Sequence, residues 1–117
     1  MFTYDCEVTR VVDGDTCDVT IDLGFKIMHK ARVRLHGINA PESRTRDKEE
    51  KYRGLQAKAR LKELVREKDT RLISHDKGKY GRVLGEILVK NHNDKWNSVN
   101  KILVKEGHAT EYYGGKR

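Results

Sequence analysis

The stretch from Arg32 to Glu42, RVRLHGINAPE, most constrains what this chain can fold into. It begins with alternating apolar and polar residues, as in a half-buried β-strand, and ends in a turn that contains Gly37 and Pro41. Glycine tolerates positive φ and proline cannot donate to a β-ladder, so the strand must end in this turn. The turn therefore delivers a carboxylate, Glu42, directly after a strand end.

Two further motifs accompany this stretch, VVDGDT at residues 11–16 and KYGR at residues 79–82. In this order and at these intervals, the three motifs resemble those of the staphylococcal-nuclease-like family, from about Thr9 to Tyr113. The resemblance implies an α+β, mainly β fold: a five-stranded OB-fold β-barrel with two packed helices. The family's third helix is expected to be absent, because the sequence stops at Arg117.

Length and charge bound the remaining possibilities. The 117 residues fit one domain, residues 1–117, and the 25 Lys and Arg against 18 Asp and Glu give a net charge of +7. This charge favours a polyanionic partner such as nucleic acid or an anionic membrane surface, although a merely soluble basic protein would look the same. No apolar run approaches the roughly 18 residues of a membrane span, and no signal-peptide pattern is present, so a cytoplasmic protein without a membrane partner is expected.

The two cysteines can be tested against the expected hairpin. If Asp13-Gly14 is a two-residue turn, Cys6 pairs with Ile21 and Cys17 with Arg10. The two cysteines then lie about 13 Å apart along the sheet, whereas a disulfide needs Cα atoms within about 7 Å. Both thiols should be reduced, buried and inert. Without a Cys-x-x-Cys motif, a structural zinc site is not expected.

The return strand of that hairpin is the clearest element of the chain. Its apolar residues alternate with Thr and Asp, which predicts one buried face formed by Cys17, Val19, Ile21 and Leu23. Asp15 has the parity of this buried set, so its carboxylate should point inward rather than to solvent.

The other elements follow from periodicity. A strand over Met28–Ile38 places Arg34 on its polar face, where the competing interpretation is an ordinary solvated edge arginine. The further expected elements are a first strand over Tyr4–Val12, a mobile loop over Ser43–Lys51, a helix over Lys51–Glu67, strands over Asp69–Ser74 and Arg82–Val89, and a helix over Val99–Glu106 that Gly107 ends.

Hydrolysis of a phosphodiester needs a cation, a base for water and donors for the phosphate oxygens. The resemblance implies a Ca²⁺ site, which suits hard oxygen ligands. The family's water-activating glutamate corresponds to Glu42 and its two phosphate-binding arginines to Arg34 and Arg82, whose planar forks match phosphate. The implied calcium ligands are Asp15, Asn39 and the main-chain carbonyl of Ala40.

Five further residues are candidates for supporting roles. Asp13 resembles an acid that orders metal-bound water, and Lys79 and Tyr80 match contacts to a terminal phosphate. Tyr112 or Tyr113 could stack on a base, because every base offers a π-face. Asn39 departs from the aspartate common in the family's best-known members, which predicts a weaker metal site.

These expectations combine into a calcium-dependent endo/exonuclease, a monomer or weak homo-oligomer that acts on DNA and RNA. Single strands should be preferred, and by the family's precedent the products carry 3′-phosphates. The alternative is a catalytically silent OB-fold module that binds nucleic acid. It would be free to lose the residues that this chain keeps, namely Asp15, Arg34, Glu42 and Arg82. A membrane-surface or protein-interaction module has only the net charge in its favour.

Overall fold

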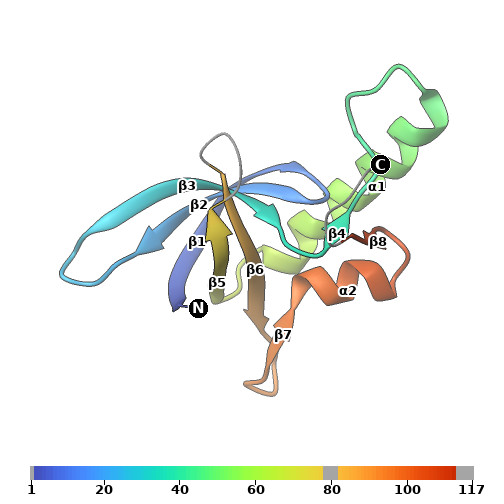
Figure 1. Cartoon of the computed structure of the whole chain (residues 1–117). Helices are drawn as coiled ribbons and strands as arrows, with labels where there is room; N and C mark the ends of the chain where they lie inside the picture. The colour runs from blue at the N-terminus through green and yellow to red at the C-terminus, as the bar shows by residue number, and fades with distance from the viewer. Residues whose placement is uncertain (1, 78–81, 113–117) are drawn as a thin grey trace.

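The computed structural model describes residues 2–77 and 82–112, and its centre is a closed barrel (Figure 1). Hydrogen-bonded neighbours follow the order β3-β2-β1-β5-β6, and a parallel pairing of β3 with β6 closes the ring. This confirms the expected five-stranded OB-fold barrel with two helices. The strands of the barrel are β1 (Phe2–Asp13), β2 (Thr16–Asp22), β3 (Met28–Leu35), β5 (Thr70–Lys77) and β6 (Val83–Lys90).

Two β-bulges change the register of the first hairpin. Cys6 faces Ile21 as expected, but the register then shifts between Val8 and Arg10 and again between Val11 and Asp13. The prediction that Cys17 faces Arg10 is therefore wrong, because Cys17 faces Val11. Each bulge adds one residue to β1, so the two turn residues are Gly14 and Asp15 rather than Asp13 and Gly14.

The first helix, α1 (Lys48–Val65), begins three residues earlier than predicted. The Asp47 side chain caps it by accepting hydrogen bonds from the backbone N–H groups of Glu49 and Glu50, whose negative charges also suit the positive end of the helix dipole. The expected loop after Ser43 is correspondingly shorter. The buried face of α1 consists of Gly54, Ala57, Leu61 and Leu64.

The C-terminal part adds short pieces around the barrel. β7 (Trp96–Ser98) extends the sheet beside β6, and it leads into α2 (Val99–Lys105), which Ser98 caps and after which Gly107 takes a positive φ of 80°. β4 (Ile38–Asn39) pairs with β8 (Thr110–Glu111). Both helices lie on the same side of the barrel, and β4 and β8 lie beside them (Figure 1).

Both cysteines are free thiols, as expected. Cys17 is fully buried, and burial raises its pKa to about 12. Cys6 is only half-buried, which departs from the expectation of a buried residue. Its pKa is also raised, mainly by burial, although a hydrogen bond to Thr70 opposes the shift.

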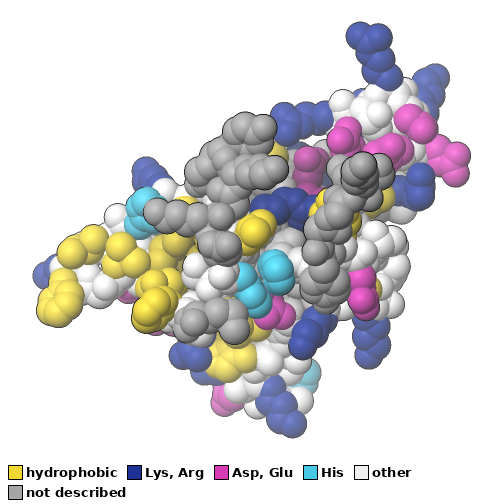
Figure 2. All heavy atoms as spheres, viewed as in Figure 1, with side chains coloured by type: hydrophobic (Ala, Val, Ile, Leu, Met, Phe, Trp, Pro, Cys, Tyr) yellow, Lys and Arg dark blue, Asp and Glu magenta, His cyan; other side chains and the backbone are white. Residues whose placement is uncertain are grey.

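The tip of the β2–β3 hairpin is apolar and exposed. Leu23, expected on the buried face, is 45% exposed, and Phe25 is 97% exposed, because the hairpin extends past the core and away from the helices (Figures 1 and 2). Phe25 and Lys26 both have positive φ values, 54° and 63°. In the described part of the chain, no helix is both long and apolar enough to span a membrane.

Candidate active site

Asp15 lies at the centre of the candidate site. Its side chain is largely buried in the turn between β1 and β2, where Oδ1 accepts a hydrogen bond from Thr16 Oγ1 at 3.0 Å and Oδ2 accepts one from the Ala40 N–H at 2.8 Å. Its main-chain carbonyl accepts the Leu35 N–H at 2.8 Å. The end of β3 and the segment after β4 are therefore both anchored to this residue. The predicted inward orientation of Asp15 is confirmed.

Arg34 is not a solvated edge arginine. Its side chain is 17% exposed, and Nη2 lies 3.5 Å from Asp15 Oδ2 and 3.4 Å from Asn39 Oδ1. Nη1 donates to the Leu35 carbonyl at 2.9 Å, which fixes the orientation of the guanidinium plane. Because one nitrogen faces both oxygens, the Asp15 carboxylate and the Asn39 amide converge on a single point.

Arg82 lies just before β6. The parallel register pairs Val33 with Val83 and Arg34 with Leu84, so Arg82 is one position before the ladder and, by alternation, on the same side of the sheet as Arg34. Its Nε is buried and has no hydrogen-bond partner among the described residues. A buried donor without a partner is costly, so this N–H is a candidate donor to an anionic ligand.

The backbone at Glu42 is fixed by α1, whereas its side chain is exposed. The Glu42 N–H donates to Glu50 Oε2 at 3.1 Å. A Cβ placed on Gly54 would lie 2.4 Å from the Glu42 carbonyl oxygen, so the turn after Pro41 packs directly on the helix backbone. Only glycine permits this approach, because any side chain would collide with main-chain atoms rather than with a movable side chain.

The neighbouring turn docks on the same helix. A Cβ on Gly14 would lie 2.6 Å from Ala57 Cβ, and Asp13 accepts a short hydrogen bond from Ser43 Oγ. Asp13 therefore ties the hairpin turn to the segment that carries Glu42. Two turns far apart in sequence are thus held together by one face of α1.

Four predicted substrate contacts fall at residues 79, 80, 112 and 113. Tyr112 is half-buried, and its N–H donates to the Gly37 carbonyl at 2.8 Å, which places it beside the turn that leads to Asn39. The other three, Lys79, Tyr80 and Tyr113, lie outside the described residues.

Sequence reasoning missed several supporting residues. Buried Asn100 donates Nδ2 to the carbonyls of His36 and Gly85, and its Oδ1 accepts the Ile87 N–H. It therefore joins α2 to the closing seam between β3 and β6. A polar residue beside Val99 on an otherwise apolar helix face was the available signal. Ser43 and Gly54 had no periodic signal, and Thr16, which alternation placed on the polar face of β2, is buried beside Asp15.

The oxygen atoms of the candidate metal ligands are of the type that binds a hard cation. Asp15, Asn39 and the Ala40 carbonyl offer one carboxylate and two neutral oxygens, the ligand types that Ca²⁺ takes. No group of three or more His, Cys, Asp or Glu residues in residues 2–77 and 82–112 is arranged to hold a metal. Any cation at this site would therefore rest on neutral oxygens and one formal charge.

A closed five-stranded barrel of this strand order, with a partly buried arginine–carboxylate pair at its first turn, defines the chain as an OB-fold domain. Residues 32–117 match the family described as staphylococcal nuclease homologue. The chain therefore belongs to that family.

Three relatives show how far the similarity reaches. Micrococcal nuclease of Shigella flexneri is 33% identical over 115 residues, which cover 94% of this chain and 60% of that protein. Protein ParB of Escherichia coli is 36% identical over 111 residues, covering 91% and 56%. An uncharacterized endonuclease of Haemophilus influenzae is 33% identical over 107 residues, covering 92% and 52%. The chain thus spans between half and two thirds of the length of these relatives.

Proposed function

We propose that this chain is a calcium-dependent phosphodiesterase that hydrolyses DNA and RNA, with single strands preferred, to products with 3′-phosphate ends. The observation that carries the proposal is the convergence of Arg34, Asp15 and Asn39 at the first turn of a staphylococcal nuclease homologue. Two of the three relatives above are themselves named as nucleases.

In the proposed reaction, Arg34 and Arg82 bind the non-bridging oxygens of the scissile phosphate. Arg34 is already oriented by its bond to the Leu35 carbonyl, and the orphaned Nε of Arg82 gains the acceptor that it lacks among the described residues. Both guanidinium groups can donate two parallel hydrogen bonds to phosphate oxygens, so they would stabilise the extra charge of the transition state.

Glu42 is proposed to take the proton of the attacking water. The new bond forms between the water oxygen and phosphorus, the bond from phosphorus to the 5′-oxygen breaks, and the leaving oxygen receives a proton from solvent. The backbone of Glu42 is locked on Gly54, while its exposed carboxylate is free to reach water. A positioned base of this kind contributes about 10² to 10⁴ in rate.

Asp15, Asn39 and the Ala40 carbonyl would hold Ca²⁺. The ion would offset the negative charge of the phosphate. In this structure the Asp15 and Asn39 oxygens both face Arg34 Nη2, so the arginine and a cation would share the same two acceptors.

The test is cleavage of a labelled single-stranded DNA with Ca²⁺, with a chelator and with neither. Arg34→Ala, Arg82→Ala and Glu42→Gln should each lower the Ca²⁺-dependent rate by about 10² or more while the fold is kept. Near-full activity in any of these variants would remove that residue from the mechanism.

A silent nucleic-acid-binding module is the second candidate, because the described residues hold no cluster of three charged or imidazole metal ligands. It predicts binding of single-stranded DNA without cleavage at any Ca²⁺ concentration. Binding that is unaffected by both Ca²⁺ and chelator would favour it.

A further inference from the structure

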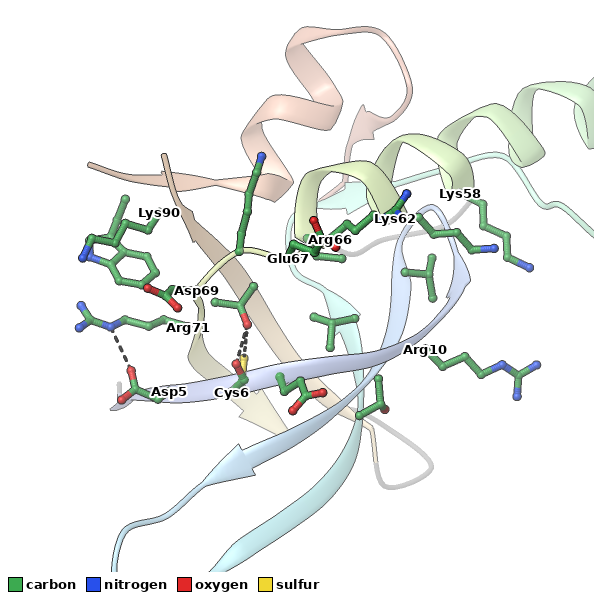
Figure 3. Close-up of a pocket in the computed structure, with 18 residues that line it drawn as sticks. Asp5, Cys6, Arg10, Lys58, Lys62, Arg66, Glu67, Asp69, Arg71 and Lys90 are labelled. Carbon is green, nitrogen blue, oxygen red and sulfur yellow. Dashed lines mark hydrogen bonds and ion pairs between the residues drawn. The ribbon is translucent and has the colours of Figure 1, made fainter. Parts of the chain in front are cut away.

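A groove lies along one edge of β1. It runs between the C-terminal half of α1, the segment of residues 66–71 and one edge of β1, and it has a volume of about 1200 Å³ (Figure 3). β1 pairs with β5 only from Phe2 to Cys6, so on that side its edge from Glu7 to Val11 borders the groove instead of a strand.

The charges in this groove are unevenly distributed. Arg10 on β1 and Lys58 and Lys62 on α1 lie toward one end, whereas Asp5 and Asp69 lie toward the other together with Arg71 and Lys90 (Figure 3). Glu7 and Glu67 also line the groove, so seven basic and four acidic side chains line it among the described residues. Within the described residues, none of the three basic side chains at the first end is in an ion pair, although Arg10 lies opposite Asp18 on β2 and helps to lower the pKa of that carboxyl. At the opposite end, Asp5 is already paired with Arg71.

Helix stability alone does not account for these cations. Lys62 is in the last turn of α1, where it complements the helix dipole. Lys58 is one turn earlier on the same face, and Arg10 belongs to a different element across the groove. Three like charges facing one hollow repel each other, and this cost is removed when an anion binds between them.

The basic end of the groove adjoins the candidate active site. Lys58 follows Ala57, which packs on Gly14, and the lining residue Val11 is two residues before Asp13. From Val11 to Asp5 the strand covers about 20 Å. Along both β1 and α1, Arg10 and Lys58 are therefore at the end of the groove nearer the catalytic turn.

The groove suits an extended ligand better than a small one. Its volume exceeds the usual upper range of about 1000 Å³ for small-molecule pockets, and no cluster of apolar side chains encloses it. At the far end, the Trp96 ring is covered by the Arg71 guanidinium at 4.1 Å, so it is not free to stack on a base. Contacts of a nucleic acid with the basic end of the groove would therefore be to its phosphates.

We propose that this groove binds the sugar–phosphate backbone of the single strand that is being cleaved, several nucleotides from the scissile bond. This inference rests on the proposed function, because the substrate is the same nucleic acid. Arg10, Lys58 and Lys62 neutralise phosphates and release their counterions, without reading the base sequence.

The test measures binding of a 20-nucleotide single-stranded DNA as a function of salt, in a Glu42→Gln background so that the strand stays intact. The variant Arg10→Gln/Lys58→Gln/Lys62→Gln should bind about 10- to 100-fold more weakly at 0.1 M salt, and the slope of log K against log salt should become shallower by about 2. The matched control, Lys26→Gln/Lys30→Gln/Lys95→Gln, removes the same charge outside the groove.

A charge-keeping variant, Arg10→Lys/Lys58→Arg/Lys62→Arg, should bind like the parent. Equal slopes for the groove variant and the control would overturn the inference, because the effect would then be one of net charge. Cleavage by the unmutated chain is scored separately. Binding without cleavage would refute the proposed function alone, whereas cleavage with equal slopes would refute the groove alone.

Discussion

Arg34 Nη2 lies 3.5 Å from Asp15 Oδ2, so the two groups form an ion pair in which both side chains are mostly shielded from solvent. The same nitrogen lies 3.4 Å from Asn39 Oδ1. The candidate calcium ligands and a candidate phosphate ligand are thus in direct contact before any substrate arrives. The charge at position 39 should therefore control the balance between arginine and cation.

Replacing Asn39 by Asp should tighten Ca²⁺ binding by about tenfold or more. Even in water, two unit charges 4 Å apart attract by about 1 kcal/mol, and Ca²⁺ carries two charges. Calorimetric titration with Ca²⁺, in the presence of a nucleotide that supplies the phosphate, measures the effect. Asn93→Asp, in the exposed turn after β6, adds the same charge elsewhere and serves as the control. Unchanged or weaker Ca²⁺ binding in Asn39→Asp would show that Asn39 is not a ligand.

Gly54→Ala should destabilise the protein, although replacing glycine by alanine inside a helix usually stabilises it. In a helix interior, alanine normally stabilises by about 1 kcal/mol over glycine. Here the new methyl group would lie 2.4 Å from the Glu42 carbonyl oxygen and 2.7 Å from the Ser43 nitrogen, both main-chain atoms. We expect a loss of about 1 to 3 kcal/mol in urea unfolding and a fall of about 10²-fold in cleavage rate as the turn moves.

Ala59→Gly separates these two effects. Ala59 is exposed on the same helix, so its change should cost about 1 kcal/mol of stability without disturbing Glu42. A Gly54→Ala protein that cleaves at the parental rate would mean that the position of Glu42 is not set by this contact.

The inward orientation of Asp15 was predicted correctly from the sequence, although the two turn residues were not. Alternation along β2 fixed its parity, and the bulges that moved the turn lie in β1. The shielding of Arg34 could not be predicted from its own strand, because it depends on Asp15 and Asn39, which are 19 residues before and 5 residues after it. The role of Gly54 could not be predicted either, because it is a contact with a segment outside the helix.

Lys26→Gly should stabilise the hairpin tip. Lys26 has a φ of 63° in a turn closed by a hydrogen bond from the Ile27 N–H to the Gly24 carbonyl, and this left-handed conformation costs a residue with a side chain about 1 to 2 kcal/mol. Glycine adopts it freely, although it also gains entropy in the unfolded chain, so a net gain of up to about 1 kcal/mol is expected in thermal unfolding. Lys30→Gly, in the regular part of β3, should instead destabilise by about 0.5 to 1 kcal/mol. A loss of stability in Lys26→Gly would contradict the assigned strain.

Alkaline pH should destabilise the fold through Cys17. Burial raises the pKa of this thiol from 9.0 to about 12, so between these values the unfolded chain loses a proton that the folded chain keeps. Stability from this group is complete below pH 9 and is lost as the pH rises toward 12, by up to about 1.4 kcal/mol for each pH unit. Urea unfolding at pH 8 to 10.5 should therefore show a steeper decline for the parent than for Cys17→Val, which has no proton to lose. In the same range, a thiol reagent should modify half-buried Cys6 before Cys17. Parallel declines for parent and variant would show that other groups, and not the Cys17 thiol, set the alkaline limit of stability.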